Sequence, residues 1–149
     1  MKCIRIREYG GPKVLQYEAQ PRPEPGPEEA LIQNQAVGVN FIDVYHRTGA
    51  YPTKLPFTPG QEGAGVVLAV GDKVKEVREG DYVGYEGTTG SYAESTVVPA
   101  SRLVPLPVGI DPRTAAALLL QSMTAHYLSH SCFPLKSGQS VLIHAGAGG

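Results

Sequence analysis

The last residues of the chain carry the clearest chemical pattern. Residues 140–144, Ser-Val-Leu-Ile-His, read as a buried-type strand that leads directly into Ala-Gly-Ala-Gly-Gly. A strand followed by spaced glycines is half of the fingerprint with which a βαβ unit binds a dinucleotide, because glycines let backbone amides approach a pyrophosphate. Gly146 and Gly148 take the first two glycine positions, and the third falls beyond Gly149. The pattern predicts the beginning of a dinucleotide site; a glycine-rich tail is the alternative.

A second candidate is the group His126, His130 and Cys132. Two histidines four residues apart share one face of a helix, so a metal site has to be weighed. We expect Cys132 to lie past the end of that helix, and no carboxylate is close in sequence. These residues, like His46, are therefore expected to be partly exposed polar groups, and no metal is predicted.

Short strands and turns must position these residues. Apolar runs fenced by glycine and proline predict an all-β barrel or sandwich in the first two thirds of the chain. The expected strands cover residues 3–7, 29–39, 63–70, 82–85, 92–98 and 102–105, and the proline-rich residues 21–27 form an extended surface connection. Helices are expected over 41–48, capped by Asn40 and stopped by Gly49, and from Asp111-Pro112 to Ser131. Residues 136–139 read as a turn.

Composition excludes several classes of protein. The chain has 149 residues and a formal net charge of −1, so it offers no basic surface for nucleic acid or for anionic lipid. Its longest apolar run is far too short to span a bilayer. The amino terminus lacks the apolar region of a secretory signal, and the 2 cysteines are too few for a disulfide framework. We expect a cytoplasmic protein.

Several ordered motifs together resemble one family. They are Val-Gly-Val-Asn-Phe-Ile-Asp-Val-Tyr at 37–45, Gly-Ala-Tyr-Pro at 49–52, Pro-Gly-Gln-Glu-Gly-Ala-Gly-Val-Val at 59–67 and Gly-Asp-Tyr-Val at 80–83. The chain resembles the medium-chain dehydrogenase/reductase superfamily and, within it, the zinc-free quinone oxidoreductases. Residues 10–15, Gly-Gly-Pro-Lys-Val-Leu, and the Asn-Phe-Ile-Asp run are particular to that branch.

The resemblance implies an architecture and a function. The expected fold is mainly β: a GroES-like, partly open β-barrel with short helices over residues 1–125, then a connecting helix and the first strand of a truncated Rossmann domain over 126–149. Full-length relatives are about twice as long, so we interpret the chain as an amino-terminal fragment that is inactive alone. Because an unpaired apolar strand exposes an edge, residues 141–143 are expected to be disordered, folded back or paired with a second copy.

The same resemblance supplies roles for single residues. Zinc-dependent relatives have cysteine and histidine at the positions of Asn40 and Gln61, and amides are poor zinc ligands, so no metal is expected. Catalytic roles are implied for Asn40, Tyr45 and Tyr51, and cofactor contacts for Asn40, Tyr45, Thr124, Gly146, Gly148 and Gly149. Each has a plainer alternative: a helix cap for Asn40, core aromatics for the tyrosines, an ordinary helix residue for Thr124.

The implied reaction is hydride transfer from NADPH to a quinone or electron-poor alkene, by a homodimer when the protein is full length. The reduced oxygen would take its proton from solvent. An enoyl-thioester reductase and a non-catalytic GroES-like binding module remain alternatives. Asp43 and Glu62 are expected to be structural, each paired with a base such as Arg47 or with backbone amides, because an unpaired buried carboxylate is costly.

Overall fold

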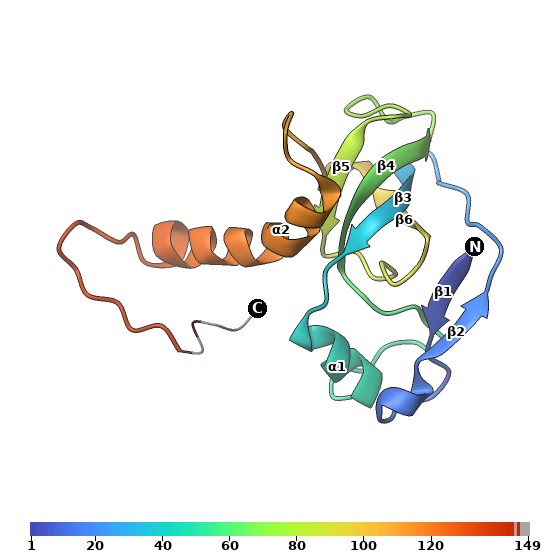
Figure 1. Ribbon diagram of the computed structural model, residues 1–149, viewed down its shortest axis with the longest axis horizontal. Helices are drawn as coiled ribbons and strands as arrows, with labels where there is room; N and C mark the ends of the chain where they lie inside the picture. The colour runs from blue at the N-terminus through green and yellow to red at the C-terminus, as the bar shows by residue number, and fades with distance from the viewer. Residues whose placement is uncertain (145, 147–149) are drawn as a thin grey trace.

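The computed structural model describes residues 1–144 and 146, and it is built around two antiparallel sheets (Figure 1). The smaller sheet pairs β1 (Lys2–Arg5) with β2 (Gln16–Ala19). The larger sheet has the order β6-β3-β4-β5-β7, formed by β3 (Glu29–Val37), β4 (Glu62–Val70), β5 (Tyr82–Glu86), β6 (Ser95–Pro99) and β7 (Leu103–Pro105). Short turns of 3₁₀-helix cover Pro12–Val14 and Ala100–Arg102. The expected mainly β fold class is confirmed, with open sheets.

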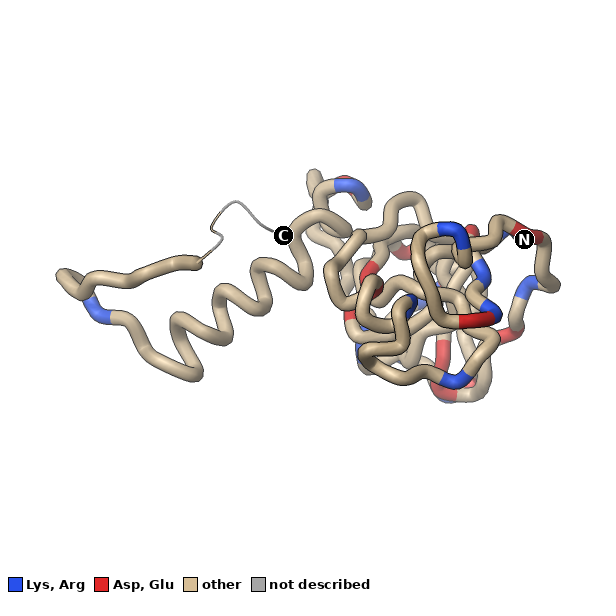
Figure 2. The backbone as a smooth tube through the Cα atoms, turned by 90° about the horizontal axis from the view of Figure 1, so that it is seen from below, with Lys and Arg blue, Asp and Glu red and all other residues tan. Residues whose placement is uncertain are grey.

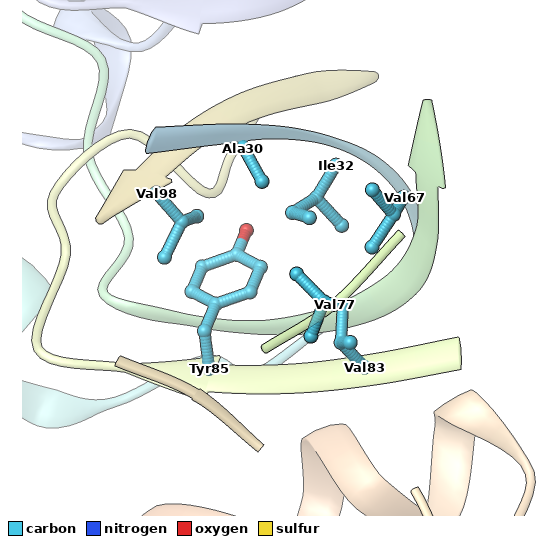
Figure 3. Close-up of a cluster of buried hydrophobic side chains, with 7 residues drawn as sticks. All are labelled: Ala30, Ile32, Val67, Val77, Val83, Tyr85 and Val98. Carbon is cyan, nitrogen blue, oxygen red and sulfur yellow. The ribbon is translucent and has the colours of Figure 1, made fainter. Parts of the chain in front are cut away.

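The hydrophobic core lies inside the curve of the larger sheet (Figure 3). It is made by Ala30, Ile32, Val67, Val77, Val83, Tyr85 and Val98. Burial of a side chain such as Ile32 stabilises the fold by about 1.5–3 kcal/mol. The Tyr85 hydroxyl donates to Asn34 Oδ1 at 2.8 Å, which satisfies the one polar atom that this ring brings into the core. Burial raises the pKa of Tyr85 to about 12.

Two helices leave the sheets. Helix α1 (Phe41–Thr48) begins after Asn40 and ends at Gly49, whose φ of 81° is the left-handed conformation that glycine adopts without steric cost. Helix α2 (Pro112–His126) begins at Asp111, whose carboxylate accepts the backbone N–H groups of Arg113 and Thr114. Hydrogen bonds from Thr114 are the main reason that the pKa of Asp111 is lowered. Both expected helix starts are confirmed.

The first turns of α2 anchor the helix to the larger sheet. Ala115 and Ala116 are buried and pack with Ala64 of β4. Beyond them α2 runs away from the sheet and continues as a turn of π-helix, η3 (Tyr127–Cys132) (Figure 1). The expected end of the helix before Cys132 is therefore wrong, because the π-helical turn includes that residue. The chain then turns at residues 137–138 and returns alongside α2.

We call residues 127–144 the C-terminal arm. The expected strand at 140–144 is wrong: these residues have no strand conformation and pair with no strand in the described part of the chain. A β-strand is stable only when a neighbour accepts and donates its backbone hydrogen bonds. Of the alternatives expected for residues 141–143, the folded-back arrangement matches the structure, and Leu142 is 80% exposed.

The arm also differs from the sheets in charge. Lys136 is the only Lys, Arg, Asp or Glu after Arg113 in the sequence. Figure 2 shows the charged residues distributed over the sheet region, with α2 and the arm almost free of them. Within residues 1–144 and 146, no helix is long and apolar enough to cross a membrane. The domain boundary expected at residue 125 remains a prediction.

Candidate functional site

A groove of about 930 Å³ lies between the start of α1, the second half of α2 and the C-terminal arm. Four of its polar lining residues, Asn40, Gln61, Gln121 and Thr124, form what we call the polar wall, and the other two, Ser129 and His144, belong to the C-terminal arm. Its apolar lining comes largely from the arm, through Leu128, Phe133, Leu135, Val141, Leu142 and Ile143. A concave site with an apolar wall and a few convergent polar groups suits a flat organic ligand that carries hydrogen-bonding substituents.

Asn40 is held at both its backbone and its side chain. Its N–H donates to Asp43 Oδ2, and its carbonyl accepts the Asp43 N–H, each at 3.0 Å. Its side-chain Nδ2 donates to Glu62 Oε2 at 3.0 Å, and its Oδ1 accepts from Gln121 Nε2 at 3.2 Å. Asn40 therefore stands at the cap position of α1, as expected, and its side chain also links α1 to β4 and α2.

Glu62, the first residue of β4, is fully buried. Besides the bond from Asn40, its Oε1 accepts the backbone N–H of Leu120 at 2.7 Å. Gly38 makes room for this carboxylate, because a Cβ at Gly38 would overlap Glu62 Oε2. Glu62 thus accepts a backbone amide, one of the two arrangements expected, and does not pair with Arg47, whose Nη1 donates to the Gly10 carbonyl at 2.6 Å.

Asp43 fixes the beginning of α1 to the loop before β6. Its Oδ2 accepts the Tyr92 hydroxyl at 2.8 Å as well as the Asn40 N–H. Burial, and then the hydrogen bond to this carboxylate, raise the pKa of Tyr92, because both disfavour the phenolate. The partners of Asp43 are therefore a backbone amide, as expected, and a phenol in place of a base.

Tyr45 and Tyr51 lie together outside the groove. Their ring centroids are 5.1 Å apart, and Tyr45 also contacts Phe41 at 5.2 Å. Both tyrosines are exposed, so the alternative that they are core aromatics is wrong. His46, expected to be solvated, is half-buried, with Nδ1 3.4 Å from Gln61 Nε2. Gln61 also lines the groove, so it lies between His46 and the groove.

Thr124 and Gly146 are the other predicted residues that the structure places at the groove. Thr124 lies one turn after Gln121 on α2, so the two side chains face the same way. Gly148 and Gly149, which were predicted to contact the cofactor, lie outside the described residues. The groove thus brings together Asn40, Thr124 and Gly146 and leaves the two tyrosines beside it.

The rings of His126 and His130 are stacked, with centroids 4.3 Å apart and an angle of 5° between their planes. His130 Nδ1 lies 2.9 Å from the Ser129 hydroxyl oxygen. Throughout residues 1–144 and 146, no three or more His, Cys, Asp or Glu side chains gather closely enough to hold a metal ion. The expected zinc-free chemistry is untested by this and stays a prediction.

Sequence reasoning missed one member of the polar wall, Gln121, and the particular backbone amide that Glu62 accepts. Gln121 was not selected, although its position three residues before Thr124 is a signal that places both on one helix face. The contact of Glu62 with the Leu120 N–H, 58 positions away, had no such signal. Local patterns report neighbours along the chain, and this contact depends on how α2 packs against β4.

Comparison with known proteins gives a consistent result. The model of the family "Alcohol dehydrogenase GroES-like domain" matches residues 26–108. A quinone oxidoreductase of Pseudomonas aeruginosa is 46% identical over 150 residues, covering 99% of this chain and 46% of that protein.

Solved structures agree. The native structure of a mycobacterial protein complexed with NADPH has a TM-score of 0.96 and 45% identity, covering 100% of this chain and 47% of that one. Escherichia coli quinone oxidoreductase complexed with NADPH has a TM-score of 0.89 and 36% identity, covering 91% of this chain and 42% of that one. The chain therefore spans slightly less than half the length of the relatives it matches.

Proposed function

The chain belongs to the alcohol dehydrogenase GroES-like domain family, among the quinone oxidoreductases of the medium-chain dehydrogenase/reductase superfamily, and from this membership we propose that it contributes to an NADPH-dependent quinone oxidoreductase. The proposed reaction moves a hydride from NADPH to a quinone or another electron-poor alkene. Asn40 and Thr124 are the proposed contacts to the nicotinamide end of the cofactor, with Tyr45 and Tyr51 at the approach of the substrate.

The observation that carries the proposal is the groove, with neutral amides and a hydroxyl on one wall and apolar side chains on the other. Uncharged donors and acceptors suit a nicotinamide ring, whose carboxamide both donates and accepts hydrogen bonds. The apolar wall suits the flat face of the same ring or of a quinone. The near-complete match of this chain to a mycobacterial structure complexed with NADPH supports the same cofactor.

The residues present fit this cofactor at its nicotinamide end. When bound, NADPH supplies the hydride and its electron pair. The protein's own part is to orient the ligand. Asn40 donates hydrogen bonds to α1 and β4 and accepts one from α2, so it needs little rearrangement on binding. Holding donor and acceptor face to face removes the entropy cost of their meeting. A quinone oxygen that gains the electron pair is proposed to take its proton from solvent, so no side chain has to act as a general acid.

The test is a fusion of residues 1–149 to the part of the Pseudomonas aeruginosa quinone oxidoreductase that follows its matched region. Consumption of NADPH is measured with benzoquinone as the acceptor. The fusion is expected to consume NADPH, and Asn40→Leu in the fusion is expected to lower kcat by on the order of tenfold to a hundredfold through loss of positioning. The 149-residue chain without the added part is expected to remain inactive.

Glu94→Gln is the matched control for this test, because Glu94 is exposed and its carboxylate accepts the Lys2 N–H away from the groove. A folded fusion that consumes no NADPH with benzoquinone would contradict the proposal. Faster turnover with a crotonyl thioester than with benzoquinone would favour the enoyl-thioester reductase instead. Binding of NADPH without turnover of either acceptor would favour the non-catalytic module.

Two further proposals concern the whole protein. We retain the cytoplasm as its location, which is supported by the free thiols of Cys3 and Cys132. We also retain the homodimer as its proposed assembly, supported by the family resemblance alone. Sedimentation of the fusion tests the second point, and a monomer at micromolar concentration would contradict it.

A further inference from the structure

Glu62 is buried at the polar wall of the groove but does not line it. Its two carboxylate oxygens accept one hydrogen bond each, from Asn40 Nδ2 at 3.0 Å and from the Leu120 N–H at 2.7 Å. In a regular α-helix the Leu120 N–H would donate to the carbonyl of Ala116. The Glu62 side chain therefore reaches the backbone of α2 in its middle, at the level of the groove.

The chemistry of these groups gives the contacts a direction. An ionised carboxylate only accepts hydrogen bonds, so the NH₂ group of Asn40 has to face Glu62. The Asn40 carbonyl oxygen then faces Gln121 and can only accept, which requires the NH₂ group of Gln121 to face Asn40. The hydrogen bonds that connect Gln121 to Asn40 and Asn40 to Glu62 therefore all run in one direction, and the buried Glu62 carboxylate sets that direction.

The other end of this series of hydrogen bonds lies at the groove. Gln121 lines the groove, and its Oε1 is buried without a hydrogen-bond partner in the described part of the chain. An amide on its own can exchange its donor and acceptor ends by rotating through half a turn, at little cost in shape. Glu62 prevents that exchange for Asn40 and, through Asn40, for Gln121.

We infer that Glu62 is a positioning residue: its carboxylate fixes which end of the Asn40 side-chain amide donates and which accepts at the ligand groove. Asn40 in turn fixes the orientation of the Gln121 amide. This inference rests on the proposed function for its consequence in catalysis, since Asn40 is there a cofactor contact. Glu62 itself touches neither cofactor nor substrate. Gly38 is part of the same arrangement, because only a residue without a Cβ leaves space for the Glu62 carboxylate.

The first test needs no cofactor and uses the 149-residue chain. In heteronuclear NMR spectra, the two side-chain NH₂ protons of Asn40 should be widely separated in chemical shift, since one of them donates to a carboxylate. Glu62→Gln should bring them together and speed their exchange with water, while Glu94→Gln leaves them unchanged. Unaltered Asn40 signals in a folded Glu62→Gln chain would overturn the inference.

The second test separates positioning from mere structural support. In the NADPH-consuming fusion, Glu62→Gln is expected to lower kcat by on the order of tenfold, with a smaller change in KM. Combined with Asn40→Ala, it should cause no further loss, because Glu62 acts through Asn40. Equal losses in the presence and absence of the Asn40 side chain would overturn the positioning role.

Two outcomes keep this inference separate from the proposed function. An inactive wild-type fusion would contradict the proposed function, and the NMR result would still decide the orientation of Asn40. If Glu62→Gln does not fold, Gln121→Met removes the donor to Asn40 Oδ1 from the half-buried end of the series. Because Glu62 stays in place in that variant and still accepts from Asn40 Nδ2, the two Asn40 NH₂ signals are expected to remain widely separated, and their coming together would overturn the inference.

Discussion

The two walls of the groove differ in how deeply their residues are buried. The polar wall is formed by residues next to the sheets and by α2, and the apolar wall is formed by the C-terminal arm. The polar wall rests on buried groups of the sheet region, such as Glu62, which is fully buried, and Asp43. In the arm every described residue is exposed except Ser129, and large apolar side chains such as Leu142 and Phe133 face solvent. Side chains with few packed neighbours contribute little to global stability.

This difference in burial indicates which wall of the groove is preorganised. Both ends of the Asn40 side-chain amide have fixed partners, so a ligand that uses this residue loses little free energy to reorganisation of the protein. The apolar wall is a patch of exposed hydrophobic residues, a feature that marks interaction sites. Its side chains gain packing partners only when a ligand or another surface covers them. We therefore propose that the polar wall recognises the ligand by hydrogen bonds and that the arm supplies apolar surface for it to bury.

The largest expected effect is on the sheet core. Ile32→Ala should destabilise the protein by about 2–5 kcal/mol, because the residue is fully buried and its loss leaves a cavity. Urea unfolding measures the change. A loss below about 0.5 kcal/mol, the size typical of surface substitutions, would mean that the sheet region is not the stable unit assumed in the comparison.

The second prediction concerns alkaline pH. The Tyr85 phenol is neutral when protonated, and burial raises its pKa from 10.0 to about 12 in the folded state. Between these values the folded protein keeps a proton that the unfolded chain releases, so this contribution to stability is complete below the unfolded value and is lost as the pH rises through the folded one. The shift corresponds to roughly 3 kcal/mol.

Tyr92 adds a loss of the same sign, since its pKa is also raised. The contribution of Tyr85 is therefore measured as the difference between the wild type and Tyr85→Phe, each unfolded by urea at increasing pH. The variant should lose less stability between pH 10 and pH 12, although removal of the hydroxyl leaves Asn34 Oδ1 without its donor. Parallel pH profiles for the two proteins would contradict this assignment.

The third prediction tests the polar wall. Gly38→Ala should cost about 1–3 kcal/mol, the range for overpacking a buried site, because the new Cβ would displace the Glu62 carboxylate. Gly11→Ala is the matched control, since a Cβ there meets nothing within 4 Å, and it should change stability by less than about 1 kcal/mol. Equal effects of the two substitutions in thermal unfolding would show that the space around Glu62 is not tight.

The smallest expected effect lies in the arm. Leu142→Ser should change the free energy of unfolding by no more than about 0.5 kcal/mol, because the side chain is already 80% exposed. The same variant in the fusion should weaken NADPH or quinone binding, because Leu142 is part of the apolar wall of the groove. A loss of stability comparable to that of Ile32→Ala would remove the contrast between the two regions.

The sequence patterns predicted those elements whose cause is local. The period-2 alternation at Cys3, Ile4 and Arg5 predicted a strand, and Asp111 with Pro112 predicted the start of α2; both are confirmed. The apolar run at 140–144 looked equally strand-like, but a strand also needs a neighbour, and no periodicity reports whether one is present. The same limit applies to Glu62, whose partner Leu120 is distant in sequence.

For the site, the family resemblance indicated Asn40 and Thr124, and both line the groove. Tyr45 and Tyr51 came from the family resemblance, and their positions beside Phe41 leave their catalytic roles as predictions. The placement of an exposed aromatic ring relative to a groove depends on the loop that carries it. That geometry is set by tertiary packing and has no signature in the spacing of the residues.

The central claim is that the amide wall of this groove receives the nicotinamide end of NADPH. It is tested most directly by nuclear Overhauser effects between the nicotinamide protons of NADPH bound to the fusion and assigned methyl groups of residues 1–149. We predict contacts with the methyl groups of Ile42, Leu120 and Thr124, which line the groove. Bound NADPH whose nicotinamide protons contact none of these groups would contradict the account.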